Sequence, residues 1–482
     1  MSFRAVRWAL VFATAAGPVL GQGVRVTGAS WWQGIDLRPF RRDSVALSST
    51  VPSGAVRRTS DGTVVSCLEG SAWCSYLRAA DRQLSQPFLH DLSVAGWGLG
   101  EGISFHAHGR VRTALGGTES AWPRMNDRFD LLDAYVEVER PTARLRLGRQ
   151  WSLGDLGAYS YDGAALLWRR AGLDGEVLGG QALVQGLNEP YTSEEIGQVD
   201  DLPPEQRAWL LGARLRWRAT SGRHAMTGTY MRVLANDRSG LYAERASVDV
   251  ATRGFGVRAD GNLALDVASG VVNEARVRAS RRVAALDLGV DARHHRPFFE
   301  LWTIWGAFAP VGFDELRASA GWTRHDGALG ATVSAARRAY RDPGTGLQSV
   351  PLRTDGWRLA ADANWTPDAP WSVVAYYGVD VGVGASQSDG TLGVARRFGE
   401  AGSIGGTMSA RQTIYEYRVG TGRMLGAFAH ADWRLRGDLR ARVEAGQYRH
   451  RLTNDAPGPD WSQRRASIRL EWALGSDPGK GR

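Results

Sequence analysis

The sequence predicts an all-β protein that folds as a single closed antiparallel transmembrane β-barrel of about 18–22 strands, with short periplasmic turns and longer extracellular loops. Three observations carry this prediction. From about residue 88 onward, apolar and polar side chains alternate in segments of about ten residues. Trp stands at the ends of several apolar faces. Short and long connections alternate along the chain.

The alternation is clearest in the last segment of the chain. Neighbouring side chains on a strand point to opposite faces, so every second residue shares one environment. Segments 211–218, 357–365 and 425–436 repeat the pattern, with charged residues, often arginine, on the polar face. In the last segment the apolar face consists of Ala466, Ile468, Leu470, Trp472 and Leu474.

A soluble β-sandwich is the alternative fold with the same period. Two features favour the membrane barrel. The polar faces carry full charges, and the apolar faces end in Trp, as at Trp357 and Trp365, which is typical of the aromatic girdles of a lipid-facing band. About twenty such strands would need linkers between sandwich domains, and no Pro-rich or Ser-rich linker interrupts them.

The lengths of the connections predict the orientation of the barrel. Outer-membrane barrels place short turns in the periplasm and long loops outside, so a long loop before the final strand leaves the C-terminus periplasmic. We expect Trp31–Arg38 to form the first strand. The short turns lie at 140–142, 220–222, 324–327, 366–368 and 436–438, and the long connections lie near 115–128, 188–204, 295–314, 341–354 and 451–462.

The composition agrees with a barrel and not with a helical membrane protein. Mean hydropathy is -0.29, and after the first 21 positions no run of about 20 apolar residues occurs. A barrel conceals its apolar surface in every second residue. The 60 Gly suit tight turns, and the 19 Trp suit the boundary between lipid and water.

The charge of the chain does not indicate a nucleic-acid partner. The formal net charge is +9 and the pI is about 9.9. Lys480 is the only lysine, and the arginines are spread over the whole chain among acidic residues instead of forming a basic patch or tail. The expected partners are outer-membrane lipid, small hydrophilic or anionic solutes and the barrel-insertion machinery.

Residues 1–21 have the pattern of a signal peptide. Arg4 and Arg7 supply the positive charge, the span 8–20 is apolar, and small residues precede Gln22 at the expected cleavage site. An uncleaved membrane anchor is the alternative, for which the apolar span is short. The expected location is therefore the Gram-negative outer membrane.

We expect 22–38 to contain the N-terminal segment and the first strand, 88–474 to form the barrel, and 475–482 to form a periplasmic tail. Residues 39–87 do not fit the strand pattern. They contain Cys67 and Cys74, the two cysteines of the chain, which predict one local disulfide in an oxidising compartment. The segment is either a disulfide-pinned surface loop or a partial plug of the lumen.

Arginines on the polar faces are the main functional candidates. Guanidinium groups around a water-filled lumen favour the passage of anions, carboxylates and phosphates. Alternatively, many of them pair with inward acids across strands and stabilise the wall, and we expect this of more than half. The predicted pore-lining residues are Arg110, Arg112, Arg144, Arg146, Arg214, Arg216, Arg218, Arg440, Arg442, Arg469, Glu137, Glu139, Glu444 and Glu471.

An apolar loop at 295–314 is a candidate constriction. A loop this apolar is not expected to stand free in water, so it either folds into the mouth of the barrel or forms two strand extensions that pack together. Its large side chains include Phe298, Phe299, Trp302, Trp305 and Phe308.

No catalytic site is expected. His106 and His108 alternate with apolar residues and should both face the lumen, but no third metal ligand can be identified. The chain has no Gly-x-Ser-x-Gly nucleophile motif and no phosphate-binding glycine loop. We therefore expect neither a metal nor a cofactor, and we read the two histidines as polar lumen residues. An outer-membrane hydrolase is the least favoured alternative.

The motifs Leu147-Gly148-Arg149-Gln150, Leu153-Gly154-Asp155 and Asp162-Gly163-Ala164 resemble a stretch of the alginate-export-type barrel family. The match covers about residues 144–168. The resemblance implies a large monomeric barrel with an arginine-rich conduit for anionic solutes or polymers. Strict alternation places Arg149 toward lipid, so a β-bulge at Gly148 would be needed to turn it inward.

These observations predict a porin-like channel of the outer membrane, through which small hydrophilic, anionic solutes diffuse along an arginine-lined lumen. Two alternatives remain open at this stage. One is an export duct for a polysaccharide or another product, working with periplasmic partners. The other is an occluded barrel with a structural or adhesive role.

Overall fold

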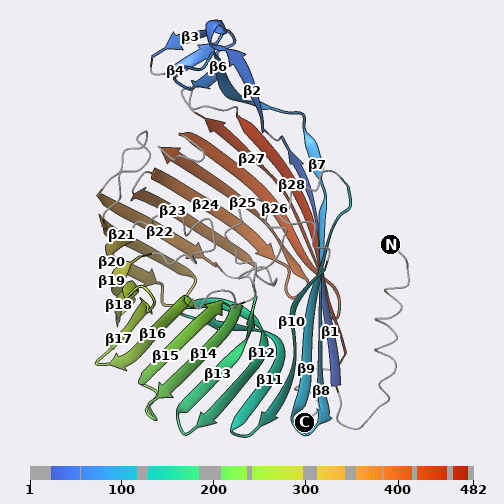
Figure 1. Cartoon of the computed structure of the whole chain (residues 1–482), viewed down its shortest axis with the longest axis vertical. Coiled ribbons are helices and arrows are strands. Elements are labelled where there is room, and N and C mark those ends of the chain that lie inside the picture. The colour runs from blue at the N-terminus through green and yellow to red at the C-terminus, as the bar shows by residue number, and fades with distance from the viewer. Residues whose placement is uncertain are drawn as a thin grey trace.

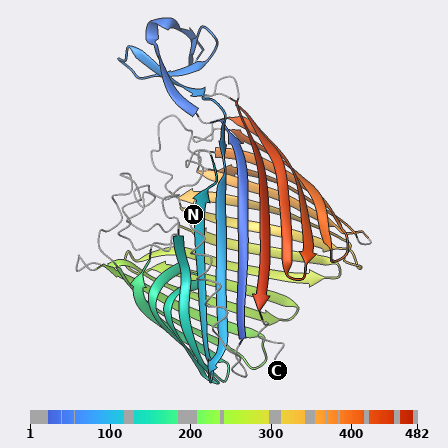
Figure 2. The same cartoon turned by 90° about the vertical axis from the view of Figure 1, so that its right-hand side faces the viewer.

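The computed structural model describes residues 23–38, 40–54, 56–116, 129–183, 208–235, 241–296, 312–341, 354–367, 370–382, 385–414, 421–452 and 460–475. These residues form an antiparallel sheet closed into a barrel of 22 strands, as the alternation predicts. Figures 1 and 2 show the barrel from two sides. None of the helices in these ranges is long and apolar enough to span a membrane.

The strands of the barrel wall are ten to fifteen residues long. They are β1 (Gly23–Leu37), β8 (Pro87–Gly100), β9 (Ile103–Ala114), β10 (Phe129–Arg140), β11 (Ala143–Gly154), β12 (Gly157–Arg170), β13 (Leu173–Ala182), β14 (Ala208–Arg218), β15 (His224–Ala235), β16 (Leu241–Gly254), β17 (Val257–Asp266), β18 (Val271–Val283), β19 (Leu286–His295), β20 (Gly312–Thr323), β21 (Leu329–Arg341), β22 (Asp355–Trp365), β23 (Trp371–Gly382), β24 (Ala385–Arg397), β25 (Gly402–Ile414), β26 (Gly422–Arg436), β27 (Leu439–Leu452) and β28 (Trp461–Gly475).

Strand β1 closes the barrel. It pairs with β28 on one side, from Arg25↔Gly475 to Asp36↔Arg464, and with β8 on the other, so neither of its edges is left open. The sequence predicts a first strand at Trp31–Arg38, whereas β1 begins at Gly23. Val24, Arg25, Val26 and Thr27 also alternate in polarity, but they fall in the part of 22–38 that we expected to be an N-terminal segment.

The alternation of short and long connections is present. At one end of the barrel the turns that join β8 to β9, β10 to β11 and each later pair through β26 to β27 have two to five residues. The turns Ala171–Gly172 and Phe255–Gly256 have positive φ at both positions, the geometry of type I′ hairpins. All connections longer than five residues, including the one between β1 and β8, lie at the other end, and β1 starts and β28 ends beside the short turns. Four connections at that other end are also short: those of β11 to β12, β15 to β16, β17 to β18 and β23 to β24 have two to five residues.

Residues 39–87, which showed no strand pattern, contain a separate small sheet. Strands β2 (Phe40–Ala46), β3 (Thr50–Ser53), β4 (Val56–Thr59), β5 (Val64–Cys67) and β6 (Trp73–Ala79) lie in the order β2-β6-β5-β4-β3. A 3₁₀ turn, η1 (Leu47–Ser49), joins β2 to β3. These strands have four to seven residues, too short for the segment length that revealed the barrel.

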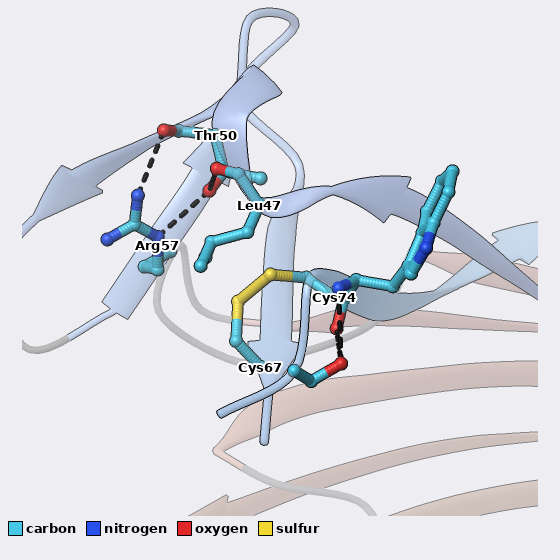
Figure 3. The surroundings of a disulfide bond; sticks show 7 residues. Leu47, Thr50, Arg57, Cys67 and Cys74 are labelled. Carbon is cyan, nitrogen blue, oxygen red and sulfur yellow. Dashed lines mark hydrogen bonds between the residues drawn. A yellow bond between two sulfur atoms is a disulfide. The ribbon is translucent and has the colours of Figure 1, made fainter. Parts of the chain in front are cut away.

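The small sheet projects beyond the long-loop end of the barrel in both views (Figures 1 and 2). After the small sheet, the chain returns to the barrel through strand β7 (Gln83–Ser85), which pairs with the end of β1. Strand β8 then begins at Pro87. The predicted disulfide between Cys67 and Cys74 is present and joins β5 to β6 at directly paired positions (Figure 3). Arg57 donates two hydrogen bonds to Thr50, which link β4 to β3.

The outer face of the wall is apolar and exposed. Leu316 is 61% exposed and Leu425 is 60% exposed, and both lie on strands whose opposite face carries charges. Seven Trp on this face lie beside the short turns or the end of β28, and two more lie at the long-loop end. An exposed apolar band between two rows of Trp is the surface that a barrel presents to lipid. The nine Trp are Trp168, Trp217, Trp322, Trp365, Trp371, Trp433 and Trp472, and then Trp209 and Trp357.

Replacing Cys67 and Cys74 together with Ser should loosen the small sheet and leave the barrel intact. The two sheets share no strand pairing, and loss of a disulfide costs about 2 kcal/mol in the unit it crosslinks. Limited proteolysis should cut faster between β5 and β6, while the heat-dependent gel mobility of the folded barrel should not change. A lower unfolding temperature of the barrel would contradict this separation.

Candidate functional site

The polar face of the strands lines the inside of the barrel. Cross-strand register places inward residues opposite one another, such as Glu137↔Arg146 and Glu139↔Arg144, while Val136↔Leu147 faces outward between them. The predicted pore-lining arginines and glutamates all occupy the inward set of their strands. They therefore share one face of the wall, and the ion pairs between strands determine which of their charges remain available.

Most of the predicted arginines form ion pairs with Asp or Glu side chains. Arg146 contacts Glu137 at 2.6 Å and Arg144 contacts Glu139 at 2.6 Å. Such pairs satisfy the guanidinium and cancel its charge toward a solute. The same holds for Arg110 with Asp91, Arg112 with Asp130, Arg214 with Glu176, Arg218 with Asp174, Arg442 with Asp432 and Glu444, and Arg469 with Glu471.

Arg216 and Arg440 differ from the other eight predicted arginines. Within the described ranges neither has an ion pair, although Arg440 lies opposite Glu471 in the register. The Glu471 carboxylate instead accepts from Arg469 at 2.7 Å. These two guanidinium groups therefore retain their charge on the inner wall.

A second set of inward charges was missed by the sequence analysis. Glu315, whose side chain is 3% exposed, lies between Arg317 at 2.9 Å and Arg338 at 2.6 Å. Asp380 continues the row by contacting Arg338 and Arg358. In the same way, Asp291 contacts Arg276 and Arg278. Glu274 contacts Arg293 and His295. The motif Glu274-Ala275-Arg276-Val277-Arg278 carries the alternation that would have revealed them.

Two hollows lie side by side on the inner wall near the short turns. The first has a volume of about 620 Å³ and is lined by strands β25–β28, with Arg434, Arg440, Arg442 and Arg469 against three acids. The second, of about 530 Å³, extends over β1, β8 and β9. Both include Arg440 and Glu471, so the hollows are continuous and Arg440 lies where they meet.

His106 and His108 face this second hollow. His106 Nε2 lies 2.9 Å from Asp133, and His108 lies 3.7 Å from Asp133 and 3.9 Å from Asp91. No group of His, Cys, Asp and Glu in the described part of the chain could hold a metal ion. The two histidines thus lie beside the carboxylates of Asp133 and Asp91 on the wall.

The expected inward turn of Arg149 through a β-bulge does not occur. The register of β11 with β10 and with β12 runs through Gly148 without a shift, so Arg149 stays on the face opposite Arg146. Its guanidinium pairs with Asp162 at 2.7 Å. The resemblance to alginate-export-type barrels, which depended on that bulge, is therefore not supported.

The predicted constriction lies outside the described residues, since Phe298, Phe299, Trp302, Trp305 and Phe308 fall between β19 and β20. The predicted signal peptide 1–21 and most of the tail 475–482 also lie outside them.

Comparisons with known proteins show a likeness in structure only. No family model and no curated protein matches the chain. OpdO of Pseudomonas aeruginosa is 11% identical, with 94% of this chain and 97% of that chain covered and a TM-score of 0.39. A BenF-like porin from Pseudomonas fluorescens Pf-5 is 10% identical, with 95% and 100% covered and a TM-score of 0.39.

The siderophore receptor PirA from Pseudomonas aeruginosa is 10% identical, with 93% of this chain and 80% of that chain covered and a TM-score of 0.49. At these values no property of those proteins carries over to this chain.

The substitution Glu315→Gln should destabilise the barrel. It removes the charge that Arg317 and Arg338 share in a nearly inaccessible position, and breaking a buried ion pair in this way costs about 3 kcal/mol. The matched control is Glu400→Gln in a short turn, where the side chain is 94% exposed and pairs with Arg434. The unfolding midpoint in urea, followed by gel mobility, should fall for Glu315→Gln and stay unchanged for Glu400→Gln.

Proposed function

We propose that this chain is a passive diffusion channel of the outer membrane for small hydrophilic, anionic solutes. The closed wall with an apolar outside and a charged inside supports a water-filled path across lipid. The observation that carries the anion preference is the first of the two hollows at the short-turn end, where four arginines face three acids and Arg440 has no ion pair within the described ranges.

The charge at this place favours anions for an electrostatic reason. A solute that enters the hollow meets the guanidinium of Arg440 without a bound carboxylate to displace, whereas Arg144 and Arg146 are already neutralised by Glu139 and Glu137. Planar guanidinium groups bind carboxylates and phosphates through two parallel hydrogen bonds. The wall therefore offers an attractive but weak site, as a conducting pore requires.

The location follows from the same surfaces. The signal peptide, the lipid-facing band and the even number of strands together suit a bacterial outer membrane. Insertion by the barrel-assembly machinery and direct contact with lipid are part of the proposal. An export duct would need periplasmic partners, and an occluded barrel would not conduct, so conductance tests the proposal directly.

The purified protein in a planar bilayer should conduct ions, and its reversal potential in a KCl gradient should have the sign of a chloride-preferring pore. Arg440→Glu should lower the ratio of chloride to potassium permeability about twofold, because it reverses an unpaired charge in the path. Arg396→Glu is the matched control, since Arg396 stacks on Trp371 on the outer face.

Cation preference of the unmodified channel, or an equal effect of both substitutions, would reject the arginine argument. A complete absence of conductance would leave the occluded barrel as the better description.

A further inference from the structure

Three glycines lie side by side across strands β11, β12 and β13. Gly148 pairs with Gly163, and Gly163 pairs with Gly180; we call these three residues the glycine line. A Cβ on Gly163 would lie 2.1 Å from the Gly179 carbonyl oxygen, and a Cβ on Gly180 would lie 2.4 Å from that of Asp162. The neighbouring backbones leave no space for a side chain at this line, which is typical of a place where strands bend sharply.

Beyond the glycine line, the hairpin of β11 and β12 contacts strands that are not its neighbours in the wall. The Leu153 carbonyl oxygen accepts a hydrogen bond of 2.6 Å from Arg214 on β14. The Leu156 carbonyl oxygen accepts one from Arg245 on β16. Within the wall, β11 pairs with β10 and β12, and β12 pairs with β11 and β13. The tip of the hairpin has therefore crossed over β13, β14 and β15 on the inside of the barrel.

One face of the hairpin is buried against the inner wall. Leu156, Tyr159 and Tyr161 are 3%, 8% and 1% exposed. They belong to one apolar cluster with inward residues of five successive strands, which would otherwise face water. Burial of these side chains holds the hairpin inside. The wall residues of the cluster on β13–β17 are Leu178, Ala182, Ala208, Leu210, Met231, Val233, Ala243 and Ala264.

The opposite face of the hairpin points away from that wall. It carries Leu153, which is 67% exposed. Arg149 and Asp162 lie in the row next to the glycine line, which is still paired with Ala134 of β10 and Gln181 of β13. Two parallel hydrogen bonds, of 2.7 and 2.8 Å, join the Arg149 guanidinium to the Asp162 carboxylate, and a third, of 3.0 Å, joins it to the Leu131 carbonyl oxygen of β10. Since the cluster fills the space on the wall side, this second face borders the open part of the lumen.

We infer that the β11–β12 hairpin beyond the glycine line is a constriction of the channel, and that Leu153 is the side chain that a passing solute contacts there. The inference rests on the proposed function. Leu153 carries no charge, so the hairpin sets the size of the solute, while the arginines near the short turns set its charge.

A cysteine at position 153 tests this inference. The two native cysteines are joined in a disulfide, so Leu153→Cys supplies the reactive thiol. The matched control is Leu425→Cys, which is exposed to a similar degree on the outer face. A hydrophilic methanethiosulfonate reagent should modify Leu153→Cys in outer-membrane vesicles and lower its single-channel conductance about twofold. Leu425→Cys should remain unmodified, because its thiol faces lipid.

The outcomes separate the two proposals. If the unmodified channel conducts but Leu153→Cys is not modified, or is modified without a change in conductance, the constriction is overturned and the channel stands. If the unmodified barrel does not conduct at all, the proposed function fails and the role of the hairpin fails with it.

Discussion

The structure depends on one constraint, the closure of the backbone hydrogen-bond ladder by β1. In lipid, every unpaired N–H or C=O group costs several kcal/mol, so a sheet with open edges is not stable there. β1 removes both edges by pairing with β28, from the other end of the chain, and with β8, which follows after the small sheet. Once the wall is continuous, each strand separates water from lipid, and outside the β11–β12 hairpin the face that a wall residue occupies follows from its parity.

Closure also explains the charge of the inner wall. Inward arginines and acids stand opposite one another on adjacent strands at separations that favour ion pairs. Most of the predicted arginines are therefore part of the wall and carry no free charge, as for Arg144 and Arg146. In the first hollow beside the short turns, where four arginines face three acids, the guanidinium of Arg440 has no ion pair within the described ranges. In the channel that we propose, the preference for anions therefore depends on a local imbalance of charge and not on the number of arginines in the chain.

The β11–β12 hairpin shows how one face of a strand can meet two environments. Leu147 and Leu153 have the same parity on β11. Leu147, before the bend, is on the outer face with Leu145, whereas Leu153, after it, lies on the lumen side of a hairpin that packs against the inner wall. This change of environment along β11 needs a bend with three glycines in register, because any side chain there would collide with the neighbouring backbone.

The sequence by itself determined the all-β barrel, the range of its strand number and the local disulfide, because the alternation of side chains and the spacing of two cysteines are local properties. Only the tertiary structure decided which arginines are paired, since partners such as Glu176 and Arg214 are far apart in the chain. It also decided that 40–79 forms a separate sheet and that β11 and β12 fold inward. The three glycines of the bend are unremarkable in sequence, and only the register across three strands brings them together.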